Sequence, residues 1–424
     1  MKVLIDDKIP YIRSAAQWLL GDVDYLPGHA FGGSRQLAEA DALIIRTRTH
    51  CDEALLADAH RLRFIATATI GHDHIDADYL RRRGIAWTNC PGCNAASVAQ
   101  YVRNSIVKTS FSLLENREQR TENSLENREQ RTENSLENKE EQSVHAPLTV
   151  GIVGYGHVGR AVRRAVEAIG CRVLLNDPPL EEAIRAQLRR GSSSHLTLEE
   201  SPSMEGVLPP EGEIEGASES SETSESSGAS WASTTFVTLQ EIAEQSDVIT
   251  FHTPLTTGGS HPTLHLADSA FFASLRRRPV IINAARGGVV DEQTLLRAHR
   301  EGLVGPIVID TWEGEPSINP HLLREAFIAT PHIAGYSADG KSCATRMALR
   351  AVCRHFGIPI DDEARFLALT APPSLPPEVQ PSGRWADDAL TLYDPLLDTA
   401  RLKASPATFE QQRGTYPLRR ETFE

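Results

Sequence analysis

The stretch Val150-Gly151-Ile152-Val153-Gly154-Tyr155-Gly156-His157-Val158-Gly159 decides the fold of this 424-residue chain. Its apolar first part predicts a buried strand, and the glycines that follow have the spacing G-x-G-x-x-G. In this spacing Gly154 permits a tight turn, Gly156 lets the backbone approach a pyrophosphate, and Gly159 lets the next helix pack close to the strand. The N-terminus of that helix offers free N–H groups to phosphates. The stretch therefore predicts a dinucleotide-binding unit.

The residues that follow this helix support the same interpretation. A second strand is predicted at Arg172–Asn176, and it ends beside Asp177. A carboxylate there can accept both ribose hydroxyls of NAD and would repel the 2′-phosphate of NADP. The cofactor expected is therefore NAD. The alternative is a glycine-rich turn without a ligand, which the strand, helix and carboxylate around it make less favourable.

Strand-like and helix-like segments alternate on both sides of this unit, which is typical of α/β folds with parallel sheets. The length exceeds one typical domain. Predicted strands lie at Lys2–Asp6, Ala42–Thr47, Arg63–Thr69, Ile85–Thr88, Thr149–Val153, Arg172–Asn176, Val248–Phe251, Val280–Asn283 and Ile307–Asp310. Predicted helices lie at Ile9–Leu20, Cys51–Asp58, Asn94–Leu114, Val158–Ile169, Leu239–Gln245, Asp268–Leu275, Glu292–Arg300 and Lys341–Phe356.

Two segments depart from this alternation and are interpreted as surface insertions. Residues 115–145 contain an 11-residue repeat, seen at Glu115–Leu125 and again at Glu126–Leu136. Residues 190–232 are rich in Ser and Glu. Neither composition supplies enough apolar side chains to offset the entropy of ordering. We expect both to lie outside the folded cores and to carry no catalytic residue.

The amino-acid composition excludes some classes of binding partner and indicates the cellular compartment. The formal net charge of −14 argues against nucleic acid and against an anionic membrane surface. No apolar run is long enough for a signal peptide or membrane span, and the six cysteines are scattered, so a cytoplasmic protein is expected. The pair Cys90 and Cys93 is interpreted as part of a tight turn, and His72 with His74 as a turn and helix start. No metal site is expected.

Three further residues follow predicted strands and suit one reaction. Arg286 and Glu315 each come after an apolar strand, and His332 follows in a Pro-His-Ile sequence. An arginine can hold a substrate carboxylate, while a histidine takes a hydroxyl proton as hydride leaves the same carbon. A carboxylate beside the histidine fixes its tautomer and stabilises its protonated form. Singly, each could be a surface or loop residue; together they predict oxidation of a 2-hydroxy acid.

With these motifs the chain resembles the D-isomer-specific 2-hydroxyacid dehydrogenases. The resemblance is carried by Ala66–His74, Pro91–Ala95, Phe251–Leu255, Thr263–Asp268, Trp312–Pro316 and His332–Tyr336. It implies a catalytic triad of Arg286, Glu315 and His332. It also implies substrate contacts from Thr47, Thr69 and Tyr336, and NAD contacts from Asp177, Thr253, Asp310 and Gly335, besides the glycines.

The details of these motifs resemble the members of that family that oxidise 4-phospho-D-erythronate on one route to pyridoxal 5′-phosphate. The substrate implied is thus a small phosphorylated 2-hydroxy acid. Arg46 and Arg48 are candidates for holding its phosphate, an inference from charge alone. Other substrates within the family, such as 3-phosphoglycerate or hydroxypyruvate, stay open as alternatives. A non-catalytic NAD-binding scaffold is a further, less favoured alternative.

The resemblance also implies a two-lobed architecture. A flavodoxin-like substrate-binding lobe would comprise residues 1–95, completed by 333–357. A Rossmann-type, doubly wound parallel sheet would comprise residues 96–332, interrupted by the two insertions. Residues 358–424 would form a small C-terminal dimerisation region, so a homodimer is expected.

Overall fold

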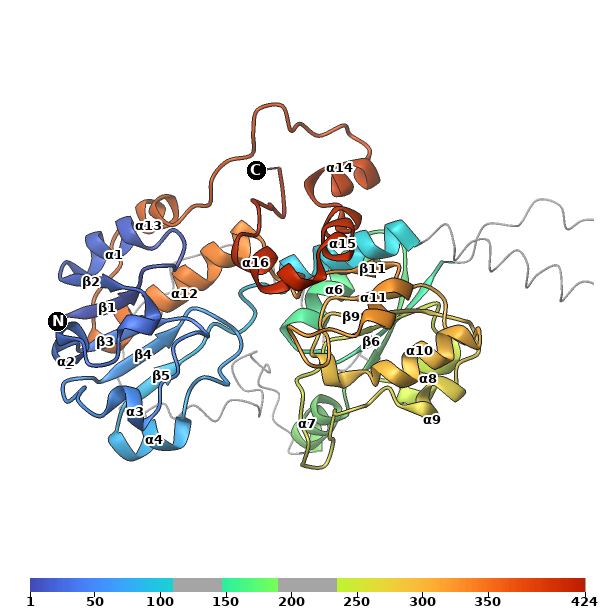
Figure 1. Ribbon diagram of the computed structural model, residues 1–424, viewed down its shortest axis with the longest axis horizontal. Helices are drawn as coiled ribbons and strands as arrows, with labels where there is room; N and C mark the ends of the chain where they lie inside the picture. Colours follow the sequence, from blue (N-terminus) through green and yellow to red (C-terminus); the bar gives the residue numbers. More distant parts are fainter. Residues whose placement is uncertain (110–146, 190–234, 424) are drawn as a thin grey trace, which may run out of the picture. The chain divides into compact units, whose positions relative to one another are not determined.

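The computed structural model describes residues 1–109, 147–189 and 235–423, so the repeat at 115–145 and the Ser-rich segment at 190–232 fall outside the described residues. The chain divides into two compact units (Figure 1). The first unit comprises Met1–Cys93, Ala183–Thr235 and Lys341–Pro373, and the second comprises Asn94–Glu182, Phe236–Gly340 and Ser374–Glu424. Each is described below by itself.

A parallel five-stranded sheet forms the centre of the first unit, with the strand order β2-β1-β3-β4-β5. Its strands are β1 (Val3–Asp6), β2 (Val23–Leu26), β3 (Ala42–Ile45), β4 (Phe64–Thr67) and β5 (Ala86–Thr88). The residues of β1, β3 and β4 are all buried, because helices cover both faces of the sheet. Continuous apolar runs are what such doubly covered parallel strands require.

Two apolar cores fill the space between this sheet and its helices. One core joins the sheet to α1 (Arg13–Leu20), to the long helix α12 (Ala338–Phe356) and to α13 (Glu363–Leu369). The other joins it to α2 (Arg35–Glu39), α3 (Glu53–Leu56) and α4 (Ala77–Arg83). Asp52 and Asp76 cap the last two helices by accepting backbone N–H bonds, which fixes where each begins.

The second unit is built on a parallel six-stranded sheet, ordered β11-β10-β9-β8-β6-β7. Its strands are β6 (Thr149–Val153), β7 (Arg172–Asn176), β8 (Val248–Phe251), β9 (Val280–Asn283), β10 (Ile307–Ile309) and β11 (Ile328–Ala329). The chain enters at β6, adds β7 on one side and then β8 to β11 on the other. The strand order therefore reverses at β6, and in open α/β sheets ligands bind at such a point, beyond the carboxyl ends of the strands.

Helices of the second unit follow its strands. They are α6 (His157–Glu167), α8 (Leu239–Gln245), α9 (Ser269–Ala273), α10 (Glu292–Arg300) and α11 (Pro320–Glu325). The start of α7 (Pro178–Arg189), up to Glu182, also belongs to this unit. One large apolar core packs α8 to α11 against the sheet. A further helix covers residues 95–109. Among the described residues, no helix is long and apolar enough to cross a membrane.

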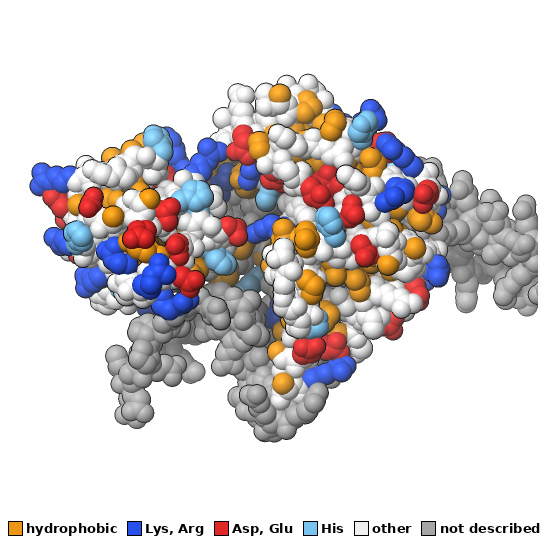
Figure 2. Space-filling view, turned by 60° about the horizontal axis from the view of Figure 1, so that its bottom comes forward, with side chains coloured by type: hydrophobic (Ala, Val, Ile, Leu, Met, Phe, Trp, Pro, Cys, Tyr) orange, Lys and Arg blue, Asp and Glu red, His pale blue; other side chains and the backbone are white. Residues whose placement is uncertain are grey.

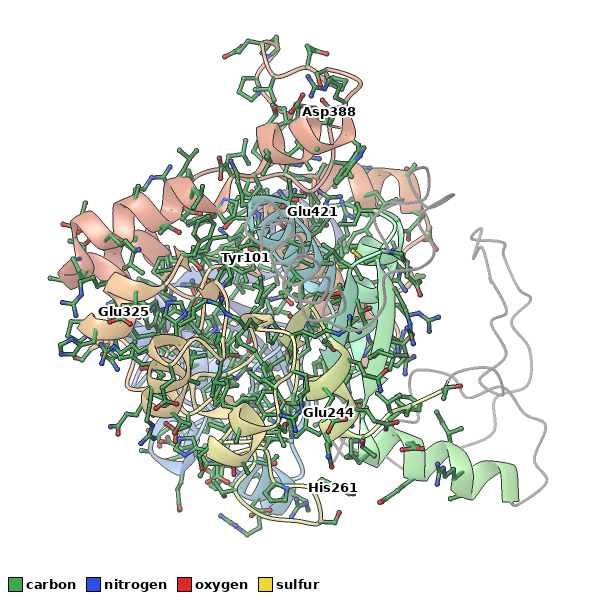
Figure 3. The ribbon with its side chains drawn as sticks, turned by 90° about the vertical axis from the view of Figure 1, so that its right-hand side faces the viewer. Tyr101, Glu244, His261, Glu325, Asp388 and Glu421 are labelled. Atoms are coloured by element: carbon green, nitrogen blue, oxygen red, sulfur yellow. The ribbon has the colours of Figure 1, made fainter. Side chains whose placement is uncertain are left out.

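The C-terminal residues pack within the second unit through α14 (Trp385–Leu392), α15 (Pro395–Ala404) and α16 (Phe409–Gly414). Thr399 accepts the backbone N–H of Ala329 in β11 at 3.1 Å. The buried Arg419 donates to the carbonyl oxygen of Ser97 at 2.6 Å and to that of Ile333 at 3.2 Å. Figure 3 shows Glu421 lying close to the helix that carries Tyr101. The last fifty residues thus reach the segment that follows His332.

The sequence predicts most of these elements within a few residues, and the α/β class with a doubly wound parallel sheet is confirmed. It misses β2, whose half-buried residues Val-Asp-Tyr-Leu form no apolar run, and β11, which has only two residues. It also does not predict the helices α2, α4, α7, α11 and α13 to α16. On the face seen in Figure 2, basic, acidic and apolar side chains are interspersed, and no broad basic field appears.

Candidate active site

The glycine-rich turn after β6 has the geometry of a phosphate cradle. Gly154 has φ +92°, and its N–H donates to the carbonyl oxygen of Asn176 in β7 at 2.8 Å. A Cβ on Gly159 would lie 2.1 Å from the carbonyl oxygen of Gly154, so only glycine lets α6 start this close to the strand. Gly156 precedes α6 with no side-chain cap, and a Cβ there would meet nothing within 4 Å. The N-terminus of the helix therefore stays open to a ligand.

Two side chains beside this turn are suited to the rest of a dinucleotide. Asp177 follows β7, and its Oδ2 accepts the Tyr155 N–H at 2.7 Å while its Oδ1 accepts the Leu180 N–H at 3.0 Å. This fixes the carboxylate at the edge of the turn. Thr253, after β8, has a buried Oγ1 without a hydrogen-bond partner among the described residues. A buried hydroxyl of this kind needs a partner, which a bound cofactor can supply.

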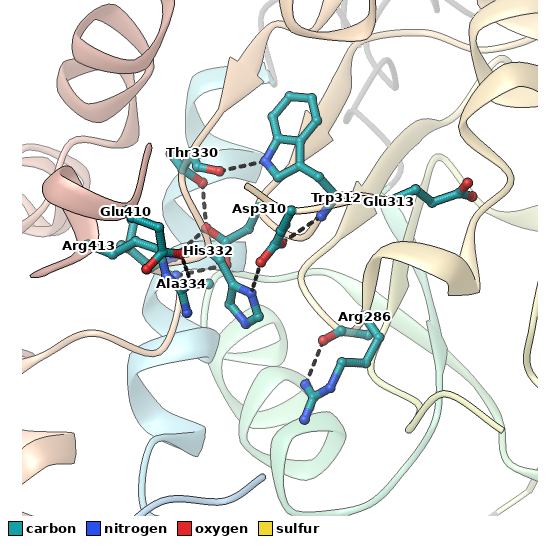
Figure 4. A network of polar contacts seen from close by, with 12 residues as sticks. Arg286, Asp310, Trp312, Glu313, Thr330, His332, Ala334, Glu410 and Arg413 are labelled. Carbon is teal, nitrogen blue, oxygen red and sulfur yellow. Dashed lines mark hydrogen bonds and ion pairs between the residues drawn. The ribbon is translucent and has the colours of Figure 1, made fainter. Parts of the chain in front are cut away.

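The histidine and the carboxylate predicted to act together form a hydrogen-bonded pair. His332 Nδ1 lies 2.8 Å from Glu315 Oε2, and Glu315 Oε1 accepts the Trp312 N–H at 2.9 Å (Figure 4). Burial opposes ionisation of Glu315, but the hydrogen bond and charge of His332 outweigh it, so the pKa of Glu315 is lowered below 4.5. An ionised Glu315 holds the proton of His332 on Nδ1 and leaves Nε2 to accept another.

Asp310 holds the backbone around His332 in an unusual conformation. His332 has φ +56°, a left-handed geometry that side chains other than glycine rarely adopt. Its N–H donates to the Asp310 carbonyl at 2.8 Å, while the Asp310 carboxylate accepts the N–H groups of Ile333 at 2.7 Å and Ala334 at 2.9 Å. Thr330 donates to the same carboxylate at 2.6 Å. Local strain held in place by several bonds is common where a side chain must be aimed.

Arg286 shares a cavity with this pair. The cavity has a volume of about 370 Å³ and is lined by Leu255, Leu264, His265, Arg286, Gly287, Gly288, Trp312, Glu313, Gly314, Glu315 and His332. Arg286 follows β9, and its Nη1 donates to the carbonyl oxygen of Ala285 at 2.8 Å. In Figure 4 its guanidinium and the imidazole of His332 extend into the same space. The three residues predicted as a triad therefore meet within the second unit.

The remaining predicted residues divide between the units. Tyr336 and Gly335 lie in the second unit, a few residues beyond His332. Thr47 and Thr69 lie in the first unit, after β3 and β4, and Thr69 Oγ1 is 2.8 Å from Thr67 Oγ1. Among the described residues, no cluster of three or more His, Cys, Asp and Glu side chains could hold a metal ion.

Two features of the site have no counterpart in the sequence prediction. Glu292, which is 5% exposed, accepts the N–H of Glu313 at 2.8 Å and so supports the turn that carries Glu315. Arg413 of α16 lies 3.4 Å from the Tyr336 hydroxyl. Neither carries a local signal, because one looks like an ordinary helix-start glutamate and the other is far from the site in sequence.

Comparison with known proteins agrees with this geometry. The family described as "D-isomer specific 2-hydroxyacid dehydrogenase, catalytic domain" matches residues 33–356. The chain belongs to this family and is a dehydrogenase. Among solved structures it is similar to a D-lactate dehydrogenase from Treponema pallidum, with a TM-score of 0.55 and 21% identity over 85% of this chain and 98% of that one. This likeness shows the fold.

Two relatives that align with nearly the whole chain share one name. An erythronate-4-phosphate dehydrogenase from Bacteroides thetaiotaomicron is 42% identical over 422 residues, covering 99% of this chain and 97% of the relative. A protein of the same name from Porphyromonas gingivalis is 36% identical, covering 99% and 94%. The structure of a D-lactate dehydrogenase from Aquifex aeolicus, in complex with NAD and lactic acid, has a TM-score of 0.51 and 22% identity over 84% of this chain and 96% of that one.

Proposed function

We propose that this enzyme oxidises 4-phospho-D-erythronate at its 2-hydroxyl group with NAD, giving 3-hydroxy-2-oxo-4-phosphooxybutanoate for the synthesis of pyridoxal 5′-phosphate. The observation that carries the proposal is the His332–Glu315 pair at 2.8 Å in one cavity with Arg286. The names of the relatives, which align with nearly the whole chain, supply the substrate.

In the proposed reaction His332 is the general base. Glu315 keeps a proton on Nδ1, so Nε2 takes the proton of the substrate hydroxyl. The imidazolium formed in this step is stabilised by the Glu315 carboxylate, which its lowered pKa keeps ionised at neutral pH. Arg286 holds the substrate carboxylate with its fork of N–H donors. Nicotinamide, when bound, accepts the hydride from the substrate carbon.

Features around the glycine turn support NAD as the cofactor. The open start of α6 suits the pyrophosphate, and the fixed carboxylate of Asp177 suits ribose hydroxyls better than a 2′-phosphate. Thr253, Asp310 and Gly335 would make the further cofactor contacts that the family resemblance implies. The Asp310 carboxylate already accepts three hydrogen bonds, so its contribution would include aiming its neighbours.

A panel of substrates and cofactors tests the proposal. Purified enzyme should reduce NAD with 4-phospho-D-erythronate at a kcat/KM far above that with 3-phosphoglycerate or glycerate, the reduced partner of hydroxypyruvate. NAD should be preferred to NADP. A higher kcat/KM with 3-phosphoglycerate would reassign the substrate within the family. No turnover of any 2-hydroxy acid by NAD-saturated, folded protein would favour a binding scaffold instead.

The proposed setting of the enzyme is the cytoplasm, and its proposed assembly is a homodimer. Support for self-association comes from exposed apolar side chains in the C-terminal region, where Trp385 is 54% exposed and Leu397 is 60% exposed. Both side chains are available to pack against a second copy of the chain. Light scattering of the intact chain would give its mass in solution.

A further inference from the structure

Arg413 brings a positive charge from the C-terminal helix α16 to the site around His332. Its Nη2 is 3.4 Å from the Tyr336 hydroxyl, and its guanidinium carbon lies 5.9 Å from the centre of the Tyr336 ring. Burial opposes ionisation of Glu315, yet the charge of Arg413, after that of His332, helps to lower the pKa of this carboxyl. In Figure 4 Arg413 lies to one side of His332, and Arg286 lies to the other.

The guanidinium has hydrogen-bonding capacity left over. Nη1 donates to Glu410 at 2.8 Å, but Nε is buried and has no hydrogen-bond partner among the described residues. The side chain is 22% exposed, whereas its partner Glu410 is 46% exposed. A partly buried guanidinium with an unused N–H is stabilised by an anion that accepts it. The environment of Arg413 therefore favours a negatively charged ligand.

The proposed substrate has two anionic ends on either side of its reacting carbon. Arg286 accounts for the carboxylate next to that carbon. A second cation beyond His332 then matches the phosphate at the other end. Arg46, a candidate from the sequence, already donates through Nε and Nη2 to the buried Asp6, at 3.2 Å each. The partner of Arg46 is a buried carboxylate, with a side chain 1% exposed, whereas the Glu410 partner of Arg413 is 46% exposed and neutralises its charge less.

We propose that Arg413 binds the phosphate group of the substrate and makes the enzyme specific for phosphorylated 2-hydroxy acids. This inference rests on the proposed function, since it assumes a substrate with a distal phosphate. It gives the C-terminal region a part in substrate recognition in addition to any part in assembly. A carboxylate at the same position would be held by the same chemistry, but the fork of a guanidinium suits phosphate well.

The test compares 4-phospho-D-erythronate with D-erythronate, which lacks the phosphate. Arg413→Gln should lower the ratio of their kcat/KM values by about 10- to 100-fold, the loss expected for one charge-assisted contact. Arg413→Lys, which keeps the charge without the fork, should restore part of that ratio. Arg401→Gln serves as the matched control, because Arg401 lies on the neighbouring helix, pairs with Asp398 at 2.8 Å and is 51% exposed. In Arg401→Gln the ratio of the two kcat/KM values should equal that of the unchanged enzyme.

A role confined to supporting Tyr336 or the His332–Glu315 pair gives a different result. In that case Arg413→Gln would lower kcat for both substrates together and shift the pH profile, leaving their ratio intact, and the proposal would be overturned. Circular dichroism and Tm would verify that each variant folds.

Failure of the proposed function is distinguishable from failure of this inference. If the unchanged enzyme shows no preference for the phosphorylated acid, the proposed function fails. Binding of inorganic phosphate to the complex of the enzyme with NAD then tests Arg413 separately. Titration calorimetry should then show affinity at least about tenfold weaker for Arg413→Gln than for the unchanged enzyme. Equal affinity would remove Arg413 from phosphate binding whatever the substrate is.

Discussion

The two sheets of this protein share a topology and differ in what occupies the point where the strand order reverses. In the first unit the initial strand β1 lies between β2 and β3, and in the second the initial strand β6 lies between β7 and β8. Each sheet then continues outward in chain order. Strand order alone would therefore predict a ligand site at the same place in both units.

The turn after the first strand makes the difference. In the first unit β1 ends in Asp6, which is fully buried and accepts two N–H bonds from Arg46 and one from the Lys8 backbone. An ion pair fills the position. In the second unit the corresponding turn holds Gly154 and Gly159, which leave the N-terminus of α6 open. If the second unit binds NAD as proposed, the chemistry of one turn, more than the fold, determines which sheet holds the cofactor.

The largest expected effect comes from the reacting residue that the second sheet supports. His332→Asn removes the proposed general base, so kcat should fall by about 100- to 10,000-fold. The dissociation constant for NAD, measured by fluorescence, should stay near that of the unchanged enzyme. The matched control is His321→Asn on α11, an exposed histidine that contacts Arg324 at 3.0 Å. Retention of more than a tenth of the turnover in His332→Asn would rule out the general-base role.

A pair of substitutions at the two turns tests the comparison directly. In Gly159→Ala the new Cβ would meet the Gly154 carbonyl oxygen at 2.1 Å, so α6 must shift away from the strand. Affinity for NAD should fall by about 100-fold, because the phosphate cradle is displaced. Asp6→Asn breaks the ion pair of the first unit and should lower Tm while leaving NAD affinity unchanged. Calorimetric titration of both variants measures this. Equal losses of NAD affinity would show that the two turns are not functionally distinct.

Much of this arrangement could be predicted from the sequence, because its signals are local. The glycine spacing after an apolar strand indicates the turn at Gly154, and the strands β6 to β9 are long apolar runs with matching lengths. Arg286 and Glu315 each follow a strand that the sequence predicts, whereas His332 follows β11, which it misses. The structure places all three around one cavity.

Other parts of the site depend on contacts between distant residues and carry no local pattern. Arg413 reaches Tyr336 only because the C-terminal helices fold back onto the second unit. Glu292 reads as an acidic residue in the first turn of α10, and nothing in the sequence tells that it is buried under the turn of Glu313. Tertiary packing determines the positions of both residues, and a sequence pattern does not predict it.

The smallest expected effect is on the pH dependence of stability, and it concerns the difference between two buried carboxyl groups, Asp6 and Glu292. Asp6 of the first unit has a guanidinium partner, whereas Glu292 accepts a backbone N–H and lies near the carboxylates of Glu313 and Glu315. Burial raises the pKa of Glu292 from 4.5 to about 7. Between these values the folded protein keeps a proton that the unfolded chain has released, so stability falls as pH rises from about 4.5 to 7.

Glu292→Gln removes this titration. The fall in the free energy of unfolding between pH 4.5 and 7 should therefore be smaller in the variant by about 2 kcal/mol, allowing for relaxation around the buried charge. Urea unfolding at pH values between 5 and 8 compares the two proteins. Parallel stability curves would mean that Glu292 ionises without cost. The turn that carries Glu315 would then be as well compensated for charge as the Asp6 turn of the first unit.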